Sequence, residues 1–381
     1  MSAAGIIFSN IHDSNIPELT TARAIGSIPF GCRYRLIDFA ISNMVNSDIG
    51  NISIITNSNY LSLMDHIGSG KDWDLARRNG GIKMLPPNVT PYGYHGREES
   101  VSRLAALKNV NLTISRITDD YIVLSDCDMI CNIDLNDIIK QHIAENANIT
   151  IAVKSLDLMP DTAKHNTIVI SDENGLVRDI LTYPNHFSGV AEVSLNILVM
   201  STAYLQQIVR DSIAYSYSSL TRDIISRSLK RDYERANIHV YRYDGYYAEV
   251  TSLSGYFDHS MELIHDMNIR NSLFGVRSRP VLTKIRNSPP TYYSENSSVR
   301  NSLIADGCVI EGTVENSILF RGVKVGRNAK VNNSIIMQDG ICGENVVLNC
   351  VISDKNVVIR DGITLSGVSS QPYYISKGRM L

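Results

Sequence analysis

The last third of the chain carries a six-residue rhythm that few folds can satisfy. From residue 308 onward, apolar residues recur every five or six positions, and Gly, Asn and Asp fill the intervals. This pattern is typical of a parallel β-helix, in which three short strands make each coil, and it accounts for about four coils. An irregular antiparallel sandwich would instead show strict alternation and hairpin turns. The inward positions expected are Cys308, Val314, Leu319, Val325, Val331, Ile336, Ile341 and Val347.

Residues 1–275 follow a different pattern, in which β-rich apolar runs alternate with segments of helical periodicity. Such alternation predicts an α/β domain whose mostly parallel sheet has helices on both faces. The strands expected are residues 4–8, 52–56, 121–124, 149–153, 167–170, 194–200 and 238–241. The helices expected are residues 39–46, 100–108, 135–145, 223–231 and 253–267.

Three segments complete this division. The Gly-, Asn- and Pro-rich stretch 68–96 is expected to be a long loop or lid over the ligand-binding edge of the sheet. Pro and Ser punctuate residues 276–296, which we interpret as a linker. The β-helix domain then covers residues 297–381.

Composition excludes several classes of function. A formal charge of -3 over 381 residues gives no electrostatic pull toward nucleic acid or anionic membranes. No apolar run approaches the roughly 20 residues of a membrane span, and the N-terminus lacks the pattern of a secretory signal. The six cysteines are scattered without paired metal spacing, so we expect small buried apolar side chains in a reduced, cytoplasmic protein.

The turn after the first strand contains no glycine. It reads Asn10, Ile11, His12, Asp13, Ser14, Asn15 and Ile16. A triphosphate must lie almost on the backbone of such a turn, and only glycine allows that approach and the positive φ it often needs. Asp13 would also place a negative charge beside the phosphates. Taken alone, this turn is compatible with an α/β protein of another kind.

The surrounding residues resemble a known family. After the turn come Leu19, Thr20, Arg23 and Ala24, and then the block at residues 30–39, FGCRYRLIDF. This layout resembles the bacterial glucose-1-phosphate adenylyltransferases (ADP-glucose pyrophosphorylases), whose turn reads G-G-x-G-T-R-L and is followed by L-T-x-x-R-A-K-P. The resemblance covers nearly the whole chain. It implies a Rossmann-like (GT-A-like) nucleotidyltransferase domain followed by a left-handed β-helix of hexapeptide repeats.

The family's nucleotide and metal motifs are altered here. Of the G-T-A-D motif only Gly96 matches, and Glu98 adds a carboxylate near the base and phosphates, or else a solvated charge in the first turn of a helix. The resemblance aligns Asp128 with the magnesium aspartate of L-A-G-D-H-I-Y, and Asp126 is the other candidate. Glu249 stands at the second magnesium acid. Both metal positions are expected to be vestigial.

The sugar-phosphate and effector motifs are altered as well. Thr182 and Tyr183 replace the acid and the lysine of the family's E-K-P grip, and the S-M-G-I-Y strand that follows begins here with Ser194. Arg33 and Arg35 remain in the retained block, where anion or effector binding and simple packing with ion pairing are both open.

These losses predict a chain with little or no catalytic power of its own. One electrostatic group at a transferring phosphoryl contributes on the order of 2–4 kcal/mol, and here the loop arginine, the lysine and the glycine backbone are absent together. The pattern resembles the second, GlgD-type subunit that accompanies the catalytic subunit in Gram-positive glycogen-making bacteria. That resemblance implies a regulatory partner in a mixed tetramer, with no required cofactor and a doubtful role for the family's Mg²⁺.

Two other functions were weighed. An active sugar-nucleotide pyrophosphorylase with divergent motifs is the first, and ADP-glucose formation by the isolated chain would distinguish it. The second is a hexapeptide acyltransferase, in which a histidine in or beside the β-helix acts as base. All nine histidines lie at or before His265, so the sequence argues against this function.

Overall fold

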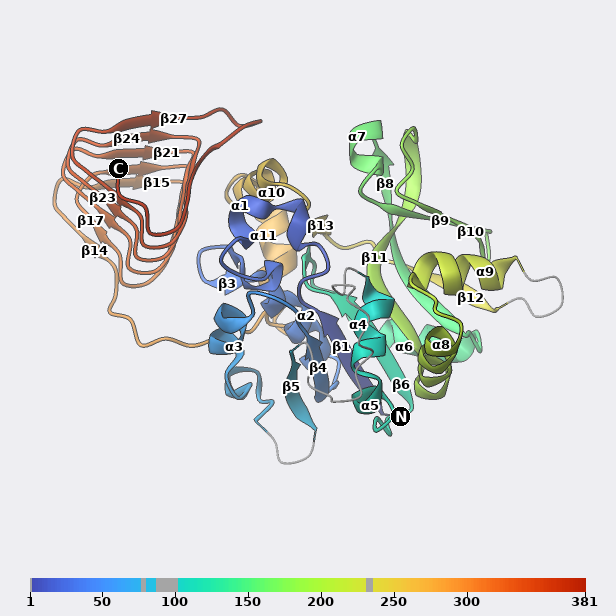
Figure 1. The fold of residues 1–381 in the computed structure, drawn as a ribbon. Helices are drawn as coiled ribbons and strands as arrows, with labels where there is room; N and C mark the ends of the chain where they lie inside the picture. The colour runs from blue at the N-terminus through green and yellow to red at the C-terminus, as the bar shows by residue number, and fades with distance from the viewer. Residues whose placement is uncertain (1, 77–79, 87–101, 231–235) are drawn as a thin grey trace. The chain divides into compact units, whose positions relative to one another are not determined.

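The computed structural model describes residues 2–76, 80–86, 102–230 and 236–381 (Figure 1). Contacts divide the chain into two compact units, neither of which is continuous in sequence. Unit 1 comprises Met1–Ile11, Phe39–Tyr60 and Ile67–Tyr247, and unit 2 comprises His12–Asp38, Leu61–His66 and Ala248–Leu381. The boundaries at residues 275 and 297 stay a prediction, because the units are defined by contacts rather than by chain order.

Unit 1 is built on a nine-stranded sheet in the order β10-β9-β11-β6-β1-β4-β5, with β8 paired to β11 and β12 paired to β8. The strands are β1 (Ala3–Phe8), β4 (Asn51–Ile55), β5 (Gly81–Leu85), β6 (Tyr121–Asp126), β8 (Ile149–Leu158), β9 (Thr167–Ser171), β10 (Val177–Thr182), β11 (Gly189–Ser201) and β12 (Ile238–Arg242). The segment β6-β1-β4-β5 is parallel throughout, as is β8 with β12. β11 runs antiparallel to β6, β8 and β9, and the edge strand β10 runs antiparallel to β9. The expected mostly parallel sheet is therefore confirmed, with two strands that run against the others.

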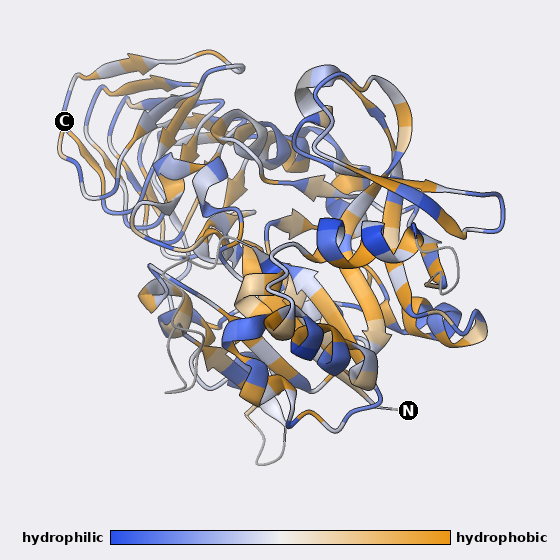
Figure 2. Cartoon of the chain, turned by 45° about the vertical axis from the view of Figure 1, so that its right-hand side comes forward, coloured by the Kyte–Doolittle hydropathy of each residue, from blue (hydrophilic) through white to orange (hydrophobic). Residues whose placement is uncertain are grey.

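Helices cover both faces of this sheet. The helices and turns of unit 1 include α2 (Leu36–Val45, its first turn in unit 2), η3 (Lys71–Trp73), α4 (Arg103–Asn109), α5 (Asn111–Ile114), α6 (Leu135–Ala144), α7 (Pro160–Ala163), α8 (Thr202–Ala214), η4 (Leu220–Ser226) and α9 (Arg227–Leu229). Figure 2 shows hydrophobic residues concentrated along the strands between them.

The central strand β1 shows how its residues select the two faces. Ile6 and Phe8 point to the core that Leu104 of α4 and Leu205 of α8 also enter. Gly5 points to the opposite face, where an added Cβ would lie 2.2 Å from Met44 Sδ of α2. Because this face is so close to α2, only glycine fits there without displacing Met44.

The expectation of a continuous loop over residues 68–96 was wrong. Part of that stretch, β5, pairs in parallel with β4 at the edge of the sheet. Gly80, with a φ of 79°, precedes this strand, and Gly81, with a φ of 75°, is its first residue; Ile82 and Met84 then alternate with a lysine. Glycine at the entry hid a short strand, since the surrounding composition is that of a loop. Residues 87–96 lie outside the described residues.

The C-terminal part of unit 2 is a parallel β-helix, as the hexapeptide rhythm predicted. Three sheets of five strands each run in the orders β14-β17-β20-β23-β26, β15-β18-β21-β24-β27 and β16-β19-β22-β25-β28, with every neighbouring pair parallel. The strands of the first sheet are β14 (Tyr292–Tyr293), β17 (Val309–Ile310), β20 (Lys324–Val325), β23 (Ile341–Cys342) and β26 (Val358–Ile359). Those of the second are β15 (Ser298–Arg300), β18 (Thr313–Glu315), β21 (Lys330–Asn332), β24 (Val347–Asn349) and β27 (Thr364–Ser366). Those of the third are β16 (Leu303–Ile304), β19 (Ile318–Leu319), β22 (Ile335–Ile336), β25 (Val351–Ser353) and β28 (Tyr373–Ile375). About four coils were expected, but each sheet has five strands. The additional coil begins with β14 and β15, whose residues are exposed and therefore lack the apolar rhythm.

Two of the expected core positions were wrong by one residue. Ile341 is 37% exposed and Val347 is only partly buried, whereas their neighbours Cys342, Val346 and Leu348 are in the core. The other six expected positions are buried there. All six cysteines are free and buried, as predicted.

The remainder of unit 2 consists of four α-helices and several short strands and 3-10 turns. They are η1 (Asp13–Asn15), α1 (Pro17–Thr20), η2 (Ile25–Ser27), β2 (Pro29–Phe30), β3 (Tyr34–Arg35), α3 (Leu61–Ile67, whose last residue is in unit 1), β13 (Ala248–Glu249), α10 (Leu253–His265) and α11 (Met267–Phe274). Among the described residues, no helix has the length and apolar character that crossing a membrane requires.

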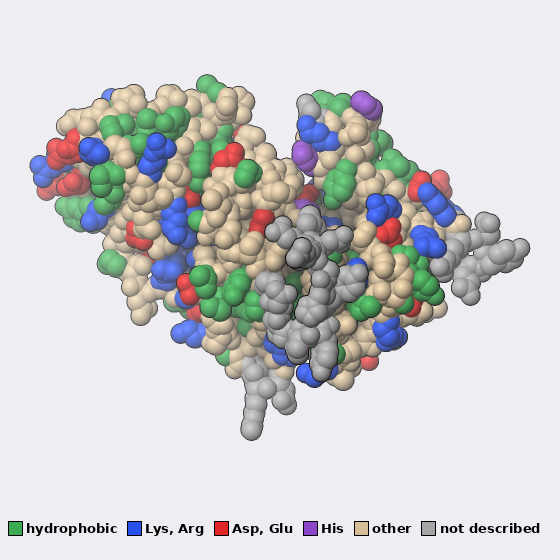
Figure 3. Space-filling view, in the orientation of Figure 1, with side chains coloured by type: hydrophobic (Ala, Val, Ile, Leu, Met, Phe, Trp, Pro, Cys, Tyr) green, Lys and Arg blue, Asp and Glu red, His purple; other side chains and the backbone are tan. Residues whose placement is uncertain are grey.

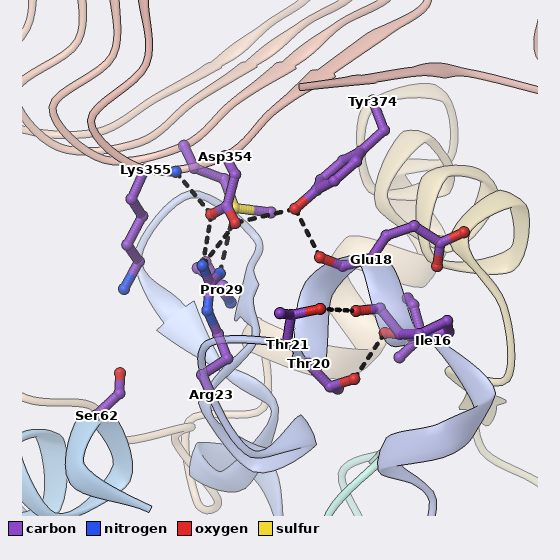
Figure 4. A network of polar contacts seen from close by, with 12 residues as sticks. Ile16, Glu18, Thr20, Thr21, Arg23, Pro29, Ser62, Asp354, Lys355 and Tyr374 are labelled. Carbon is purple, nitrogen blue, oxygen red and sulfur yellow. Dashed lines mark hydrogen bonds and ion pairs between the residues drawn. The ribbon is translucent and has the colours of Figure 1, made fainter. Parts of the chain in front are cut away.

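A buried ion pair ties the N-terminal segment of unit 2 to its β-helix. Arg23 Nη2 donates to both oxygens of Asp354, at 2.7 and 2.6 Å, and both side chains are 2% exposed (Figure 4). The backbone N–H of Lys355 donates to Asp354 Oδ1 at 2.6 Å. The Tyr374 hydroxyl approaches Asp354 Oδ2 at 3.2 Å and also bonds to the carbonyl oxygen of Glu18 at 2.6 Å.

Candidate functional site

The turn after β1 satisfies its own polar groups. η1 follows His12, and none of the described residues 10–16 has a positive φ. Asp13 Oδ1 accepts the backbone N–H of Ile25 at 2.8 Å, and the Asp13 carbonyl accepts the Thr20 hydroxyl at 2.7 Å. A turn that cradles phosphates points backbone N–H groups outward from left-handed or glycine residues. Here the turn is closed by its own carboxylate instead.

The other residues of this turn offer little to an anion. Asn10 is partly buried, Ser14 is exposed, and Asn15 donates its backbone N–H to the carbonyl of His12 at 3.0 Å. His12 Nδ1 lies 4.0 Å from Glu249 Oε1 within unit 2. The candidate metal acid Glu249 thus neighbours a histidine.

The acid at the carboxyl end of β6 is bound by an arginine. Arg103, in the first turn of α4, donates from Nε to Asp126 Oδ1 at 2.9 Å and from Nη2 to Asp126 Oδ2. Burial lowers the pKa of Arg103, but the charge and hydrogen bonds of Asp126 outweigh it and hold that pKa above its usual range. A carboxylate whose two oxygens accept a guanidinium in this way does not fit a magnesium ligand. Asp128, two residues on, is 1% exposed.

The sugar-phosphate residues do not converge on a cavity of useful size. Thr182 is exposed, and Tyr183 is 50% exposed with a φ of 51°. Ser194 is buried, and its Oγ accepts the backbone N–H of Asn196 at 3.1 Å. The hollow lined by Arg103, Ser194 and Asn196 measures ≈ 20 Å³, enough for about one water molecule. Gly96 and Glu98 lie outside the described residues.

Asn196 stands where the family's strand motif has glycine. It has a φ of 57°, in the left-handed region, at the irregularity where the pairing of β11 with β8 shifts register. Asparagine tolerates this conformation better than most residues with a side chain. The backbone conformation typical of glycine is therefore present without the glycine.

A basic hollow in unit 2 contains both arginines of the retained block. Arg33 is exposed and Arg35 is 8% exposed, and the guanidinium of Arg35 donates to the carbonyl and hydroxyl oxygens of Ser62 at 2.5 and 3.0 Å. Three further cations line the same hollow, which measures ≈ 30 Å³. They are Arg286, Arg321 and Lys355.

Burial, together with neighbouring cations, lowers the pKa of two basic groups in this hollow. Burial, Arg35 and Arg23 lower the pKa of Lys355 to about 7. Burial lowers the pKa of Arg35 to about 10. Arg321 Nε donates to Asp306 at 3.1 Å, whereas its Nη2 is buried and has no hydrogen-bond partner among the described residues. An anion is the ligand that such a group of donors would accept.

Sequence reasoning found Arg33 and Arg35 but missed the cations that accompany them. Arg286 lies in the expected linker, and Arg321 and Lys355 lie among the turns of the β-helix, where charged residues are ordinarily solvated. Arg103 was missed as well, since it occupies the start of a helix where a surface charge is the usual interpretation. The basic character shared by residues so distant in sequence was not apparent until the structure placed them around one hollow.

Comparison with known proteins assigns both parts of the chain. Residues 14–264 match the nucleotidyl transferase family, and residues 290–371 match the GlmU-like C-terminal hexapeptide family. The chain is 35% identical over 374 residues to the glycogen biosynthesis protein GlgD of Bacillus subtilis (strain 168), covering 98% of this chain and 95% of that protein. The chain belongs to the nucleotidyl transferase family, and it is of the GlgD type.

Glucose-1-phosphate adenylyltransferases are also among its relatives in this family. The protein of that name from Geobacillus stearothermophilus is 33% identical over 321 residues, which are 84% of this chain and 80% of that protein. The one from Bacillus mycoides (strain KBAB4) is 31% identical over 351 residues, 92% of this chain and 90% of that protein. The expected family and the order of its two folds are therefore confirmed.

Proposed function

We propose that this chain serves glycogen biosynthesis as the regulatory, catalytically impaired subunit of a cytoplasmic glucose-1-phosphate adenylyltransferase. The complex would convert ATP and glucose 1-phosphate into ADP-glucose and diphosphate. This chain would assemble with the catalytic subunit in a mixed tetramer and change its turnover or effector response. The names of the relatives support the pathway and the reaction class.

The observation that carries the impaired role is the Arg103–Asp126 pair. It places a fixed internal cation on the acid at the end of β6, in the sheet region where a nucleotidyltransferase would bind a metal and phosphates. The closure of the preceding turn by Asp13 supports the same conclusion. The retained scaffold with altered chemistry favours a role through contact, which requires that the partner's active form bind this chain better than its inactive form does.

The test is co-expression with the catalytic subunit from the same cell, followed by a mass measurement and an assay of ADP-glucose formation. We expect a mixed assembly whose rate or effector response differs from the partner's own by about 5- to 150-fold, and an isolated chain without activity. Turnover by the isolated chain at about 10 per second would favour the alternative, an active pyrophosphorylase with divergent motifs. Separate elution of the two proteins, with only the partner's own rate, would refute the regulatory role.

No cofactor is required by this proposal. Carboxylates hold Mg²⁺ mainly when substrate phosphates complete its shell, so we expect ATP–magnesium to bind weakly. Micromolar affinity in calorimetry, lost in Asp128→Asn, would contradict this part of the proposal.

Anion binding at Arg33 and Arg35 is a second candidate function, favoured by the lowered pKa of Lys355 and by the buried Nη2 of Arg321. Inorganic phosphate or diphosphate should raise the melting temperature of the isolated chain, and Arg35→Gln should remove that effect. If a neutral salt at equal ionic strength stabilised the protein equally, specific anion binding would be refuted.

A further inference from the structure

Unit 1 contains a larger hollow, outside the altered catalytic region, that no step above uses. It measures ≈ 360 Å³, within the range of small-molecule sites. α8, η4 and α9 supply most of its wall, together with the turn that joins α8 to η4. Its lining combines aromatic rings with hydrogen-bonding side chains of Asn, Gln, Asp and Arg.

Two tyrosines form the aromatic part of this hollow. The rings of Tyr215 and Tyr217 are stacked, with centroids 5.7 Å apart and an angle of 26° between their planes. Tyr215 is 68% exposed. An exposed aromatic ring beside a cavity offers a flat apolar face whose immobilisation costs little entropy, since tyrosine has only two χ angles.

The position of Tyr217 is fixed before any ligand arrives. Its backbone N–H donates to the Ser212 carbonyl at 3.0 Å, and its carbonyl accepts Lys108 Nζ at 2.8 Å. The Arg227 guanidinium lies 5.2 Å from the ring centroid and donates to the phenolic oxygen at 2.9 Å. Ser216, with a φ of 57°, makes the turn that places the two tyrosines together. Such preorganisation lowers the entropic cost of binding.

The polar part of the lining has the chemistry that sugar hydroxyls require. Gln207 carries both donors and an acceptor, and Asp211 can accept two hydroxyl protons. Asn148 offers its amide N–H groups, since its Oδ1 already accepts the backbone N–H of Asn237 at 2.8 Å. Each of these side chains reaches solvent to some extent. A pyranose ring presents C–H groups on its faces and hydroxyls around its edge, so it can lie on an aromatic ring while its edge bonds to such groups.

The charge of the lining argues against a phosphorylated ligand. Among the lining residues that the structure describes, Asp211 and Asp223 face one cation, Arg227. Asp223 is already engaged by Arg222 and by the backbone N–H groups of Ser218 and Ser219. With Asp223 paired to Arg222, Asp211 and Arg227 leave no excess of positive charge to hold a phosphate, so the hollow suits a neutral polyhydroxylated ligand.

We propose that this hollow is a binding site for a neutral hexose oligosaccharide, with one ring stacked on Tyr215. The site does not depend on the proposed regulatory function. That function determines only the first probe, a linear α-1,4-glucan such as maltoheptaose. The ligand would bind to unit 1 without any reaction.

The test is a titration of the isolated full-length chain with maltoheptaose by calorimetry or ligand-observed NMR. Glucose 1-phosphate and adenosine serve as comparison ligands. We expect saturable binding of the neutral glucan and about 5- to 150-fold weaker binding in Tyr215→Ala, the range that loss of one stacked ring gives in a comparable stacking site. Gln207→Ala should weaken binding less.

Tyr292→Ala is the matched control, since Tyr292 is a 58% exposed tyrosine on β14 of unit 2, and it should bind the glucan as the original chain does. All variants should share one melting temperature. No saturable binding of maltoheptaose up to about 20 mM, well beyond the affinity of an ordinary specific site, would overturn the proposal. So would preferential binding of adenosine, or equal losses in Tyr215→Ala and Tyr292→Ala. None of these results bears on assembly with a catalytic subunit, which the titration does not contain.

Discussion

Removal of Arg23 should destabilise unit 2 more than removal of any exposed charge. The side chain and its partner Asp354 are each 2% exposed, and a single nitrogen reaches both carboxylate oxygens. In Arg23→Met the carboxylate stays buried without its cation, a change that typically costs about 3–5 kcal/mol. The N–H of Lys355 and the hydroxyl of Tyr374 still approach Asp354, so we expect a loss of about 3 kcal/mol, at the lower end of that range.

A double-mutant cycle separates the ion pair from the packing of the arginine stem. Arg23→Met, Asp354→Asn and the double variant would be unfolded in urea and followed by circular dichroism. Once either partner is gone, removing the other costs less, so the double variant should be more stable than the sum of the single losses predicts, by about 2 kcal/mol. The only tryptophan, Trp73, is buried in unit 1, and its fluorescence reports that unit separately.

The exposed pair of Lys140 and Asp137 on α6 is the control. Their side chains are 69% and 51% exposed with 3.0 Å between Nζ and Oδ1, and the same cycle there should give no resolvable coupling. If the losses at Arg23 and Asp354 add to within about 0.5 kcal/mol, the buried pair does not act as a unit and the reasoning fails.

Three other changes test the electrostatics and the backbone. Because burial lowers the pKa of Lys355 from 10.5 to about 7, the native chain binds fewer protons than the unfolded chain between those pH values, and stability should rise with pH across that window. Lys355→Met should therefore be more stable than the original chain at pH 6, on the order of 2 kcal/mol, and urea unfolding at higher pH should show the advantage fading by pH 10.5. Arg103→Gln leaves Asp126 buried without its cation and should cost about 3–5 kcal/mol, with no gain of ADP-glucose formation; a stable and active variant would contradict the role given to this pair. Cys350 has a φ of 52° at the β-helix corner where Asn316 and Asn333 have 46°, so Cys350→Asn should gain about 1 kcal/mol, seen as a higher melting temperature, while Cys342→Asn, which buries an amide in the core, should lower it.

The sequence predicted the architecture correctly where the structure is repetitive or depends on local periodicity. Each coil of the β-helix repeats the same inward apolar positions, so the architecture was predictable even though the register slipped by one residue at Ile341 and Val347. β5 was missed because glycine and proline around it outweighed the short alternation of Ile82, Lys83 and Met84. Neither error changed the fold, since the periods of the neighbouring elements agreed.

The contacts that decide the site were beyond such reasoning. Arg103 and Asp126 are 23 positions apart, and Arg23 and Asp354 are 331 apart. Helix and strand periodicities relate only neighbouring residues, so they cannot predict a contact between residues this far apart in sequence. The resemblance made Asp126 a candidate metal ligand, but only the structure shows that an arginine of the same chain is already bound to it.

The altered residues share a physical logic. In a nucleotidyltransferase, donors and acids at the ends of the strands are left unsatisfied by the protein so that nucleotide, metal and sugar phosphate can complete them. In this chain the carboxylate of Asp13 accepts a backbone N–H of its own unit, and Asp126 accepts an arginine. Each of these contacts gives a carboxylate a partner inside the protein, which an enzyme's free active site leaves open. The same contact occupies a group that would otherwise bind substrate or metal. Selection for a stable scaffold without turnover would favour this combination, whereas selection for turnover would oppose it.

The basic hollow around Arg35 and Lys355 differs from these satisfied residues, because cations brought together without enough acids favour an external anion. Ligand response is therefore expected there rather than at the end of β6, and the pH dependence of Lys355→Met and the phosphate titration of Arg35→Gln measure that difference directly.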